Sequence, residues 1–269
     1  MDDPRIAELD EIAACAVDAV ERETLVDAAV PSFLLRRYLD AGGDPLGGAL
    51  GLALTQSLAC AAADETAAGR AGWLTLFVEA TAVADDERIV SAIAGLIAAL
   101  RAAWPGQSRI HEACASIEAC LRAAEIVEPG DLMQDAIDHL EHLIGGRYRP
   151  GEGLVDGSLD DHVLAASALL TAFELTGRLP YSMLAEELAA IARLNPDGAT
   201  AIRCTLARVL CRLASLHANP EYRGAAVITE GADFRADASR ILAAESARAR
   251  AGSPSAAAAY GLALFDLLK

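Results

Sequence analysis

Residues 163–173 read Val-Leu-Ala-Ala-Ser-Ala-Leu-Leu-Thr-Ala-Phe, with apolar side chains at nearly every position. Wound into a helix, this stretch has no polar face, so other parts of the protein must surround it. The segments 46–65, 197–217 and 254–268 have the same character. We therefore expect several helices that are buried on every side, with abundant alanine allowing neighbouring helices to approach closely.

The segment 130–145 has a different pattern. Its apolar residues, among them Leu132 and Leu140, fall on one side of a helix, and Asp138 and Glu141 fall on the other. One face of this helix is therefore expected to contact solvent. An inner ring of fully apolar helices, enclosed by an outer ring of helices with one wet face, accounts for both patterns.

Breaks rich in Gly, Pro and Asn divide the chain into about twelve helices joined by short connections. The predicted spans are 3–22, 25–41, 46–65, 68–84, 86–104, 107–126, 130–145, 159–176, 180–194, 197–217, 233–249 and 254–268. Six helical hairpins can close into an (α/α)6 toroid. Because the segment 254–268 is too apolar to cap an open solenoid, we predict closure. The predicted fold class is all-α, with one toroid domain over 1–269.

The composition excludes several classes of function. The chain has 39 acidic residues against 22 Lys and Arg, a formal net charge of −17, and no basic stripe. Nucleic acids and anionic membranes are therefore not expected as partners. Aromatic residues make up only 4% of this alanine-rich chain, which argues against a polysaccharide hydrolase but leaves a small-sugar site open.

The cysteines and the amino terminus indicate the cellular compartment of the protein. The six cysteines lie in predicted helices without Cys-x-x-Cys spacing, so they are expected to be small buried residues in a reducing cytosol. The first residues, Met1 to Arg5, are acidic and do not resemble a signal peptide. The apolar segment 47–63 is predicted to be a buried helix. We therefore predict a cytoplasmic protein, with no cofactor and no metal.

Several stretches of the second half carry a resemblance to a known family. Residues 153–170 (GLVDGSLDDHVLAASALL) and 174–181 (ELTGRLPY) resemble the helical domain of bacterial thioredoxin-domain-containing proteins related to N-acylglucosamine 2-epimerases, in the six-hairpin superfamily. Residues 256–263 are similar to the final inner helix of that group, and 219–223 to the turn before its penultimate helix.

The resemblance covers roughly residues 140–269 and implies an α/α toroid. For an active member it also implies proton transfer on a small sugar or related metabolite. Residues 1–130 lack the Gly- and aromatic-rich catalytic loops of the sugar epimerases. The expected function is therefore an epimerase-like toroid that binds or acts on a small sugar-like metabolite, with catalytic residues retained or lost. The alternative is a non-catalytic helical interaction module, whose partner would be a separately encoded thioredoxin-like protein.

The polar, glycine-rich loop 147–162 is the first candidate for a site, because such loops at one end of a rigid ring commonly carry function. Asp156 and Glu152 are predicted to work as an acid–base pair. His162 is predicted to exchange a proton and Arg149 to hold an anionic group.

Three further residues are candidates for the same site. Arg147 and Tyr148 are predicted to bind substrate, and His111, at the start of a helix, to face the central cavity as a general base. In the alternative interpretation the loop is structural: Ser158 or Asp160 caps the next helix, and the arginines pair with nearby acids.

Asp135, His139 and His142 have i, i+4, i+7 spacing, so one helix face could present three metal ligands. The neighbouring acidic residues favour a solvated outer face instead. A metal-dependent helical enzyme is therefore the third and weakest hypothesis.

Overall fold

The computed structural model describes residues 4–43, 48–127, 131–195, 197–226, 228–229 and 231–269. Within them the chain forms thirteen α-helices, one 3-10 turn and one two-stranded hairpin. The α-helices are α1 Pro4–Glu21, α2 Ala29–Ala41, α3 Ala49–Ala63, α4 Ala67–Ala80, α5 Glu87–Ala103, α6 Ile110–Ala123, α7 Leu132–Gly145, α8 Leu159–Thr176, α9 Leu179–Arg193, α10 Thr200–Ala218, α11 Pro220–Ala226, α12 Phe234–Ala251 and α13 Pro254–Leu268. The remaining elements are η1 Trp104–Gly106, β1 Tyr148–Arg149 and β2 Gly153–Leu154.

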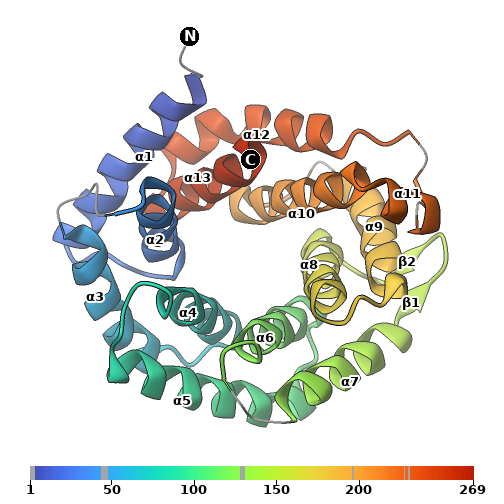
Figure 1. Cartoon of the computed structure of the whole chain (residues 1–269), viewed down its shortest axis with the longest axis horizontal. Coiled ribbons are helices and arrows are strands. Elements are labelled where there is room, and N and C mark those ends of the chain that lie inside the picture. Colours follow the sequence, from blue (N-terminus) through green and yellow to red (C-terminus); the bar gives the residue numbers. More distant parts are fainter. Residues whose placement is uncertain (1–3, 44–47, 128–130, 196, 227, 230) are drawn as a thin grey trace.

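The helices form two concentric rings (Figure 1). The inner ring consists of α2, α4, α6, α8, α10 and α13, and the outer ring of α1, α3, α5, α7, α9 and α12. In each hairpin the outer helix precedes the inner one. The ring is closed, because α13 packs against both α1 and α2. The all-α class and the ring of about twelve helices predicted from the sequence are confirmed.

Helix α8 shows why the inner ring forms. As expected for an apolar helix, Val163, Ala166, Leu170 and most of its other residues are buried. Its amino terminus is fixed by a capping box, in which the Ser158 hydroxyl accepts the Asp161 N–H and the Asp161 carboxylate accepts the Ser158 N–H. The prediction that Ser158 caps this helix is thus confirmed.

One expectation about the rings is wrong. The segment 46–65 was expected to be buried on every side, but α3 lies in the outer ring and Leu52 is 45% exposed. Much of the apolar character of α3 comes from alanine, and an exposed methyl group leaves little apolar area in water. Alanine content therefore permits burial without requiring it.

Ring closure depends on a close contact between α13 and α2. A Cβ atom on Gly261 would lie 2.8 Å from Cδ2 of Phe33, so only glycine fits without displacement. The Phe33 ring also packs against Phe265, with ring centroids 5.8 Å apart. These contacts join the last helix of the chain to the first inner helix.

Two elements were not predicted. The turn expected at 219–223 contains the seven-residue helix α11, which begins at Pro220 after Asn219, whose side chain accepts the Glu221 N–H at 2.9 Å. The hairpin β1–β2 pairs Tyr148 with Leu154. Both elements are too short for hydrophobic periodicity to reveal them.

The cysteines are free thiols. Cys114, Cys120, Cys204 and Cys211 are buried as expected, but Cys15 is exposed, because its α1 position faces solvent, and Cys60 is partly exposed. Burial raises the pKa of Cys120 and Cys204 to about 12 and that of Cys211 to about 11. These three thiols therefore remain protonated and unreactive at neutral pH.

One helical stretch, Glu87–Gly106, is long and apolar enough to cross a membrane by length and composition alone. It comprises α5 and η1 in the outer ring, where Ile93 and Leu100 are buried and Val90 is exposed. Core helices of folded proteins pass the same test, and 33% of the apolar window is buried within the ring.

Candidate functional site: the central cavity

The six inner helices enclose a cavity of about 270 Å³. Small residues of α4 and α6, including Gly72 and Ala115, keep its centre open. Thr75, Ser167 and Thr205 belong to its wall, and the hydroxyls of Thr75 and Thr205 each donate to the carbonyl four residues earlier in their own helix. Polar groups thus converge on the axis of the ring, where a purely structural core would place aliphatic side chains.

Glu118 and Arg122 form the first part of a charged cluster at this cavity. They lie one turn apart on α6, and Nη2 of Arg122 donates to Oε1 of Glu118 at 2.8 Å. Thr171 of α8 donates to the same oxygen at 3.0 Å. The carboxylate therefore links two inner helices.

Arg212 of α10 completes the cluster from a third helix. Its Nη1 lies 3.7 Å from Oε1 of Glu118, and its Nη2 lies 2.9 Å from Oε2 of Glu174. It also donates to the Ser167 carbonyl at 3.2 Å and to the Thr171 hydroxyl at 3.0 Å. Two arginines and two glutamates, together neutral, are thus held by α6, α8 and α10.

The electrostatics of the cluster keep it ionised. Burial raises the pKa of Glu118, but Arg122, Arg212 and hydrogen bonds outweigh that effect and lower it to about 2. Burial lowers the pKa of Arg212, whereas the carboxylates of Glu118 and Glu174 raise it. An arginine nevertheless keeps its charge at neutral pH.

A second charged group lies one turn away on α10. Arg208, one turn before Arg212 on α10, also lines the wall, and its Nε donates to Oδ2 of Asp266 at 2.8 Å. Arg36 lies 3.7 Å from the other oxygen of the same carboxylate. The cavity wall therefore presents three arginines (122, 208 and 212) and two glutamates (79 and 118).

The cavity presents charged and polar residues from α2, α4, α6, α8 and α10. A carboxylate with a pKa of about 2 is a weak base, and among the residues described no histidine or aromatic ring lines the wall. Guanidinium groups, hydroxyls and a carboxylate can instead hold a small molecule rich in hydrogen-bonding groups.

The predicted loop site lies elsewhere. Figure 1 shows the hairpin β1–β2 at the periphery of the ring, beside α7 and α9. Asp156 and Glu152 are both exposed, and Asp156 has a left-handed backbone with φ of 56°. None of the seven residues predicted as a site is among the described residues that line the central cavity.

His162, predicted to exchange a proton, is buried against the loop. Its Nε2 accepts the Leu154 N–H at 3.2 Å and its Nδ1 lies 2.7 Å from the Ser158 carbonyl, so the ring is neutral and protonated at Nδ1. It is enclosed by Gly153 and Gly157, at each of which a Cβ atom would lie within 2.8 Å of the imidazole. These contacts fold the loop over the start of α8.

His111 likewise stabilises helix termini. Its Nδ1 and its backbone nitrogen each lie 2.9 Å from Oδ1 of Asp161. Although partial burial raises the pKa of Asp161, hydrogen bonds from Ser158 and His111 lower it overall. Asp161 therefore joins the first turns of α6 and α8.

The remaining predicted residues form part of the hairpin. The Tyr148 hydroxyl donates to Oε2 of Glu187 on α9 at 2.6 Å, and burial together with that carboxylate raises the pKa of Tyr148 to about 12. Oε1 of Glu187 accepts the Gly151 N–H at 2.7 Å. Arg147 and Arg149 are exposed. A catalytic role for this loop remains a prediction.

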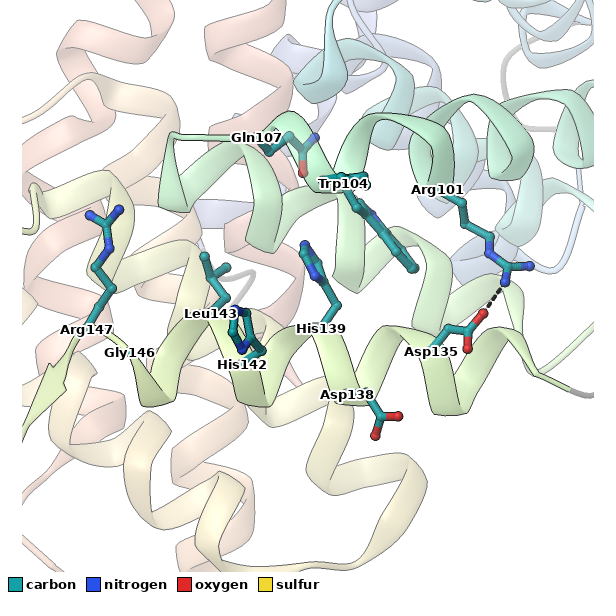
Figure 2. Close-up of a pocket in the computed structure, with 11 residues that line it drawn as sticks. Arg101, Trp104, Gln107, Asp135, Asp138, His139, His142, Leu143, Gly146 and Arg147 are labelled. Atoms are coloured by element: carbon teal, nitrogen blue, oxygen red, sulfur yellow. Dashed lines mark hydrogen bonds and ion pairs between the residues drawn. The ribbon is translucent and has the colours of Figure 1, made fainter.

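The three residues considered as metal ligands have different surroundings in the structure (Figure 2). Asp135 pairs with Arg101, and His139 stacks on Trp104 with ring centroids 5.2 Å apart. His142 is exposed. In the part of the chain that the structure describes, no group of three or more His, Cys, Asp or Glu side chains could hold a metal ion.

The sequence did contain a signal for the central cluster. Arg208 and Arg212 lie among apolar residues in the segment 197–217, and Glu118 and Arg122 lie among apolar residues in 107–126. Charged side chains in helices that must be buried mark either paired charges or a site. Their partners, however, lie on other helices and cannot be identified from spacing.

The fold and this site together define a closed ring of six helical hairpins with a charged central cavity. No protein-family model matches the sequence, and no curated protein matches it significantly.

Proposed function

We propose that the protein binds a small, hydroxyl-rich, anionic metabolite in the central cavity, as an epimerase-like member of the six-hairpin superfamily. The observation that carries this proposal is the placement of Arg122, Arg208 and Arg212 on the cavity wall beside the Ser167 and Thr205 hydroxyls. The cytoplasmic location predicted from the sequence is compatible with such a ligand.

The size and chemistry of the cavity define the ligand class. A volume of about 270 Å³ lies near the lower end for small-molecule sites, at roughly nine times the volume that a water molecule occupies in the liquid. Guanidinium groups recognise carboxylate and phosphate, and hydroxyls and carboxylates bind sugar hydroxyls. A sugar acid or sugar phosphate of monosaccharide size supplies both kinds of group.

Binding without turnover is the activity that the geometry favours. A proton-transfer site needs a base whose pKa lies near the working pH. Glu118, the carboxylate at the centre of the cluster, has its pKa lowered to about 2 by Arg122 and Arg212. The cluster thus supports recognition of a ligand more directly than epimerisation.

The experiment is a titration of the purified protein with glucose, glucuronate and glucose 6-phosphate. Binding is measured by calorimetry and by the shift in thermal unfolding. We expect the two anionic sugars to bind more tightly than glucose, because of the arginines. Thr205→Val removes a wall hydroxyl while keeping side-chain shape, and should weaken binding by about fivefold, the value of one hydrogen bond.

Thr55→Val is the matched control. Thr55 and Thr205 each donate to the carbonyl four residues earlier at 3.0 Å, but Thr55 lies on the outer helix α3. Thr55→Val should therefore change the stability of the fold as much as Thr205→Val does, but leave the affinity for the sugar ligands unchanged. Absence of binding by all three probes, or equal effects of the two variants on affinity, would count against the central cavity as the site.

The interaction-module alternative, including a thioredoxin-like partner, receives less support. In the described residues, the large exposed apolar side chains are spread along the chain, at most one to each helix: Ile6, Val26, Leu39, Leu52, Val90, Ile126, Met133, Leu194, Ile228 and Leu268. Scattered residues of this kind are normal on protein surfaces.

A further inference from the structure

A separate cavity lies where the ring closes, between the outer helices α1 and α12 and the inner helix α13 (Figure 1). Its volume is about 310 Å³, and among the described residues it shares no lining residue with the central cavity. This cavity, the seam cavity, is lined by Arg5 and Glu8 of α1, Ser239 and Ser246 of α12, and Tyr260 and Leu264 of α13.

The α1 wall of the seam cavity carries one positive and one negative side chain. Arg5 and Glu8 are three residues apart on the helix, a spacing that leaves about 5–6 Å between Cβ atoms on the same face. Both residues are only half-buried, so a molecule in the cavity can contact them. The wall thus offers two opposite charges at a separation that a small molecule can span.

Hydrogen bonds hold the Glu8 carboxylate in place. The Tyr260 hydroxyl donates to its Oε2 at 2.8 Å, and the Ser246 hydroxyl donates to its Oε1 at 3.2 Å. Burial, together with the nearby Glu8, raises the pKa of Tyr260 to about 12, so the phenol stays protonated and donates at neutral pH. Since a carboxylate has about four acceptor sites, each oxygen of Glu8 can accept a further bond from a ligand.

Arg5 is positioned by a contact with α12. Its Nη2 donates to the Ser239 hydroxyl oxygen at 3.1 Å. A guanidinium carries five N–H donors in a planar fork that matches a carboxylate, and it can bind more than one partner at once. Because the Ser239 oxygen accepts from Arg5, its own O–H can donate to the same anionic group.

The rest of the lining is apolar and includes Leu242, Leu264 and Leu267. The two charges on α1 select between ligands, because Glu8 repels a simple anion and Arg5 repels a simple cation. A molecule that carries both charges on neighbouring atoms, attached to an apolar body, matches the charged wall and the apolar wall together.

We propose that the seam cavity binds a free α-amino acid with an apolar side chain. Its carboxylate pairs with Arg5 and Ser239, and its ammonium group pairs with Glu8. Its side chain packs against Leu264 and Leu267. A volume of about 310 Å³, roughly ten times that of a water molecule in the liquid, suits a ligand of this size. The site does not depend on ligand binding in the central cavity.

The test is a calorimetric titration of the purified protein with L-leucine, 4-methylpentanoate and 3-methylbutylamine. The second probe lacks the ammonium group of leucine and the third lacks its carboxylate, but both keep the side chain. We expect leucine to bind with a Kd of about 1 mM or tighter, and each analogue about tenfold more weakly, because each leaves one charge of α1 without its partner. Saturating leucine should also raise the thermal unfolding midpoint.

Two variants should change the preference between the probes in opposite directions. Glu8→Gln should weaken leucine binding about tenfold but not the binding of 4-methylpentanoate, because the repelling carboxylate is gone. Arg5→Gln should weaken leucine binding but not the binding of 3-methylbutylamine. Glu11→Gln is the matched control, because Glu11 is exposed one turn further along α1 and pairs with Arg250 outside the cavity lining. It should bind leucine as the natural chain does.

Three results would overturn the proposal. They are the absence of leucine binding, equal affinity for leucine and both analogues, and unchanged leucine affinity in Glu8→Gln and Arg5→Gln while circular dichroism shows both folded. The second result would mean that only the apolar body is recognised, and the third would place the amino acid elsewhere on the protein. The analogue series uses the natural chain, so it tests the proposal even if a variant fails to fold.

Discussion

Glu118 on α6 and Arg212 on α10 approach to 3.7 Å at the central cavity, although α8 lies between their helices in the inner ring. The Thr171 hydroxyl of α8 bonds to both of them. One carboxylate thereby connects three consecutive inner helices. The cluster contributes to stability as well as to the proposed binding site.

Replacing Glu118 should therefore change how stability depends on pH. Its pKa falls from 4.5 to about 2 on folding, so its contribution is fully present above about pH 4.5 and is lost as pH falls through 2. The shift corresponds to about 3 kcal/mol at neutral pH. Glu118→Gln should lower the free energy of unfolding in urea by a comparable amount at pH 7. It should also flatten the dependence between pH 4.5 and 2.

Glu21→Gln provides the comparison, because Glu21 is exposed at the end of α1. It should unfold with nearly the same free energy as the natural chain at every pH. If the acid-unfolding profiles of the two variants coincide, the ion pairs of Glu118 do not stabilise the folded state.

Closure of the ring can be tested at Gly261. Gly261→Ala places a methyl group against the Phe33 ring, which is fully buried and cannot easily move. We expect a loss of about 1–3 kcal/mol in thermal or urea unfolding, the usual effect of overpacking. Gly51→Ala, inside outer helix α3 with open space around it, should raise stability by about 0.5–1 kcal/mol through helix propensity. A Gly261→Ala variant as stable as Gly51→Ala would be inconsistent with the close α2–α13 contact.

The packing of the loop on His162 gives a second pair of glycine variants. Gly151 and Gly153 both have φ of 79°, so alanine is strained at either position. Only at Gly153 would the new methyl group also meet neighbouring side chains, at 2.7 Å from Nε2 of His162 and 2.7 Å from Cδ1 of Ile191. Gly153→Ala should therefore be less stable than Gly151→Ala by about 1–3 kcal/mol. Equal unfolding free energies would mean that His162 does not hold the loop.

Asp156 distinguishes the loop from the central cavity as a binding site. Asp156→Ala should lose about 1 kcal/mol of stability because alanine is disfavoured at φ of 56°, whereas Asp156→Gly should not. Since Asp156 is remote from the cavity wall, both variants should bind the cavity ligand with unchanged affinity in calorimetry. Weakened binding by both would instead favour the loop site predicted from the sequence.

The sequence could predict the helices because their signals are local. The spans 159–176 and 254–268 agree with α8 and α13 at both ends, since apolar periodicity and Gly, Ser and Pro positions define where a helix starts and stops. The assignment of each helix to the outer or the inner ring was harder to predict from the sequence. Because α3 is rich in alanine, hydropathy assigned it to the wrong ring.

The sites depended on distant contacts that spacing does not encode. The hairpin β1–β2 is held by Glu187 from α9, and His162 accepts the Leu154 N–H of this hairpin. The charged cluster takes its members from three helices. The sequence by itself determined the all-α class and the approximate spans of the twelve helices that form the six hairpins. Only the tertiary structure decided which charges face the cavity, because that direction follows from how each helix is rotated when the ring closes.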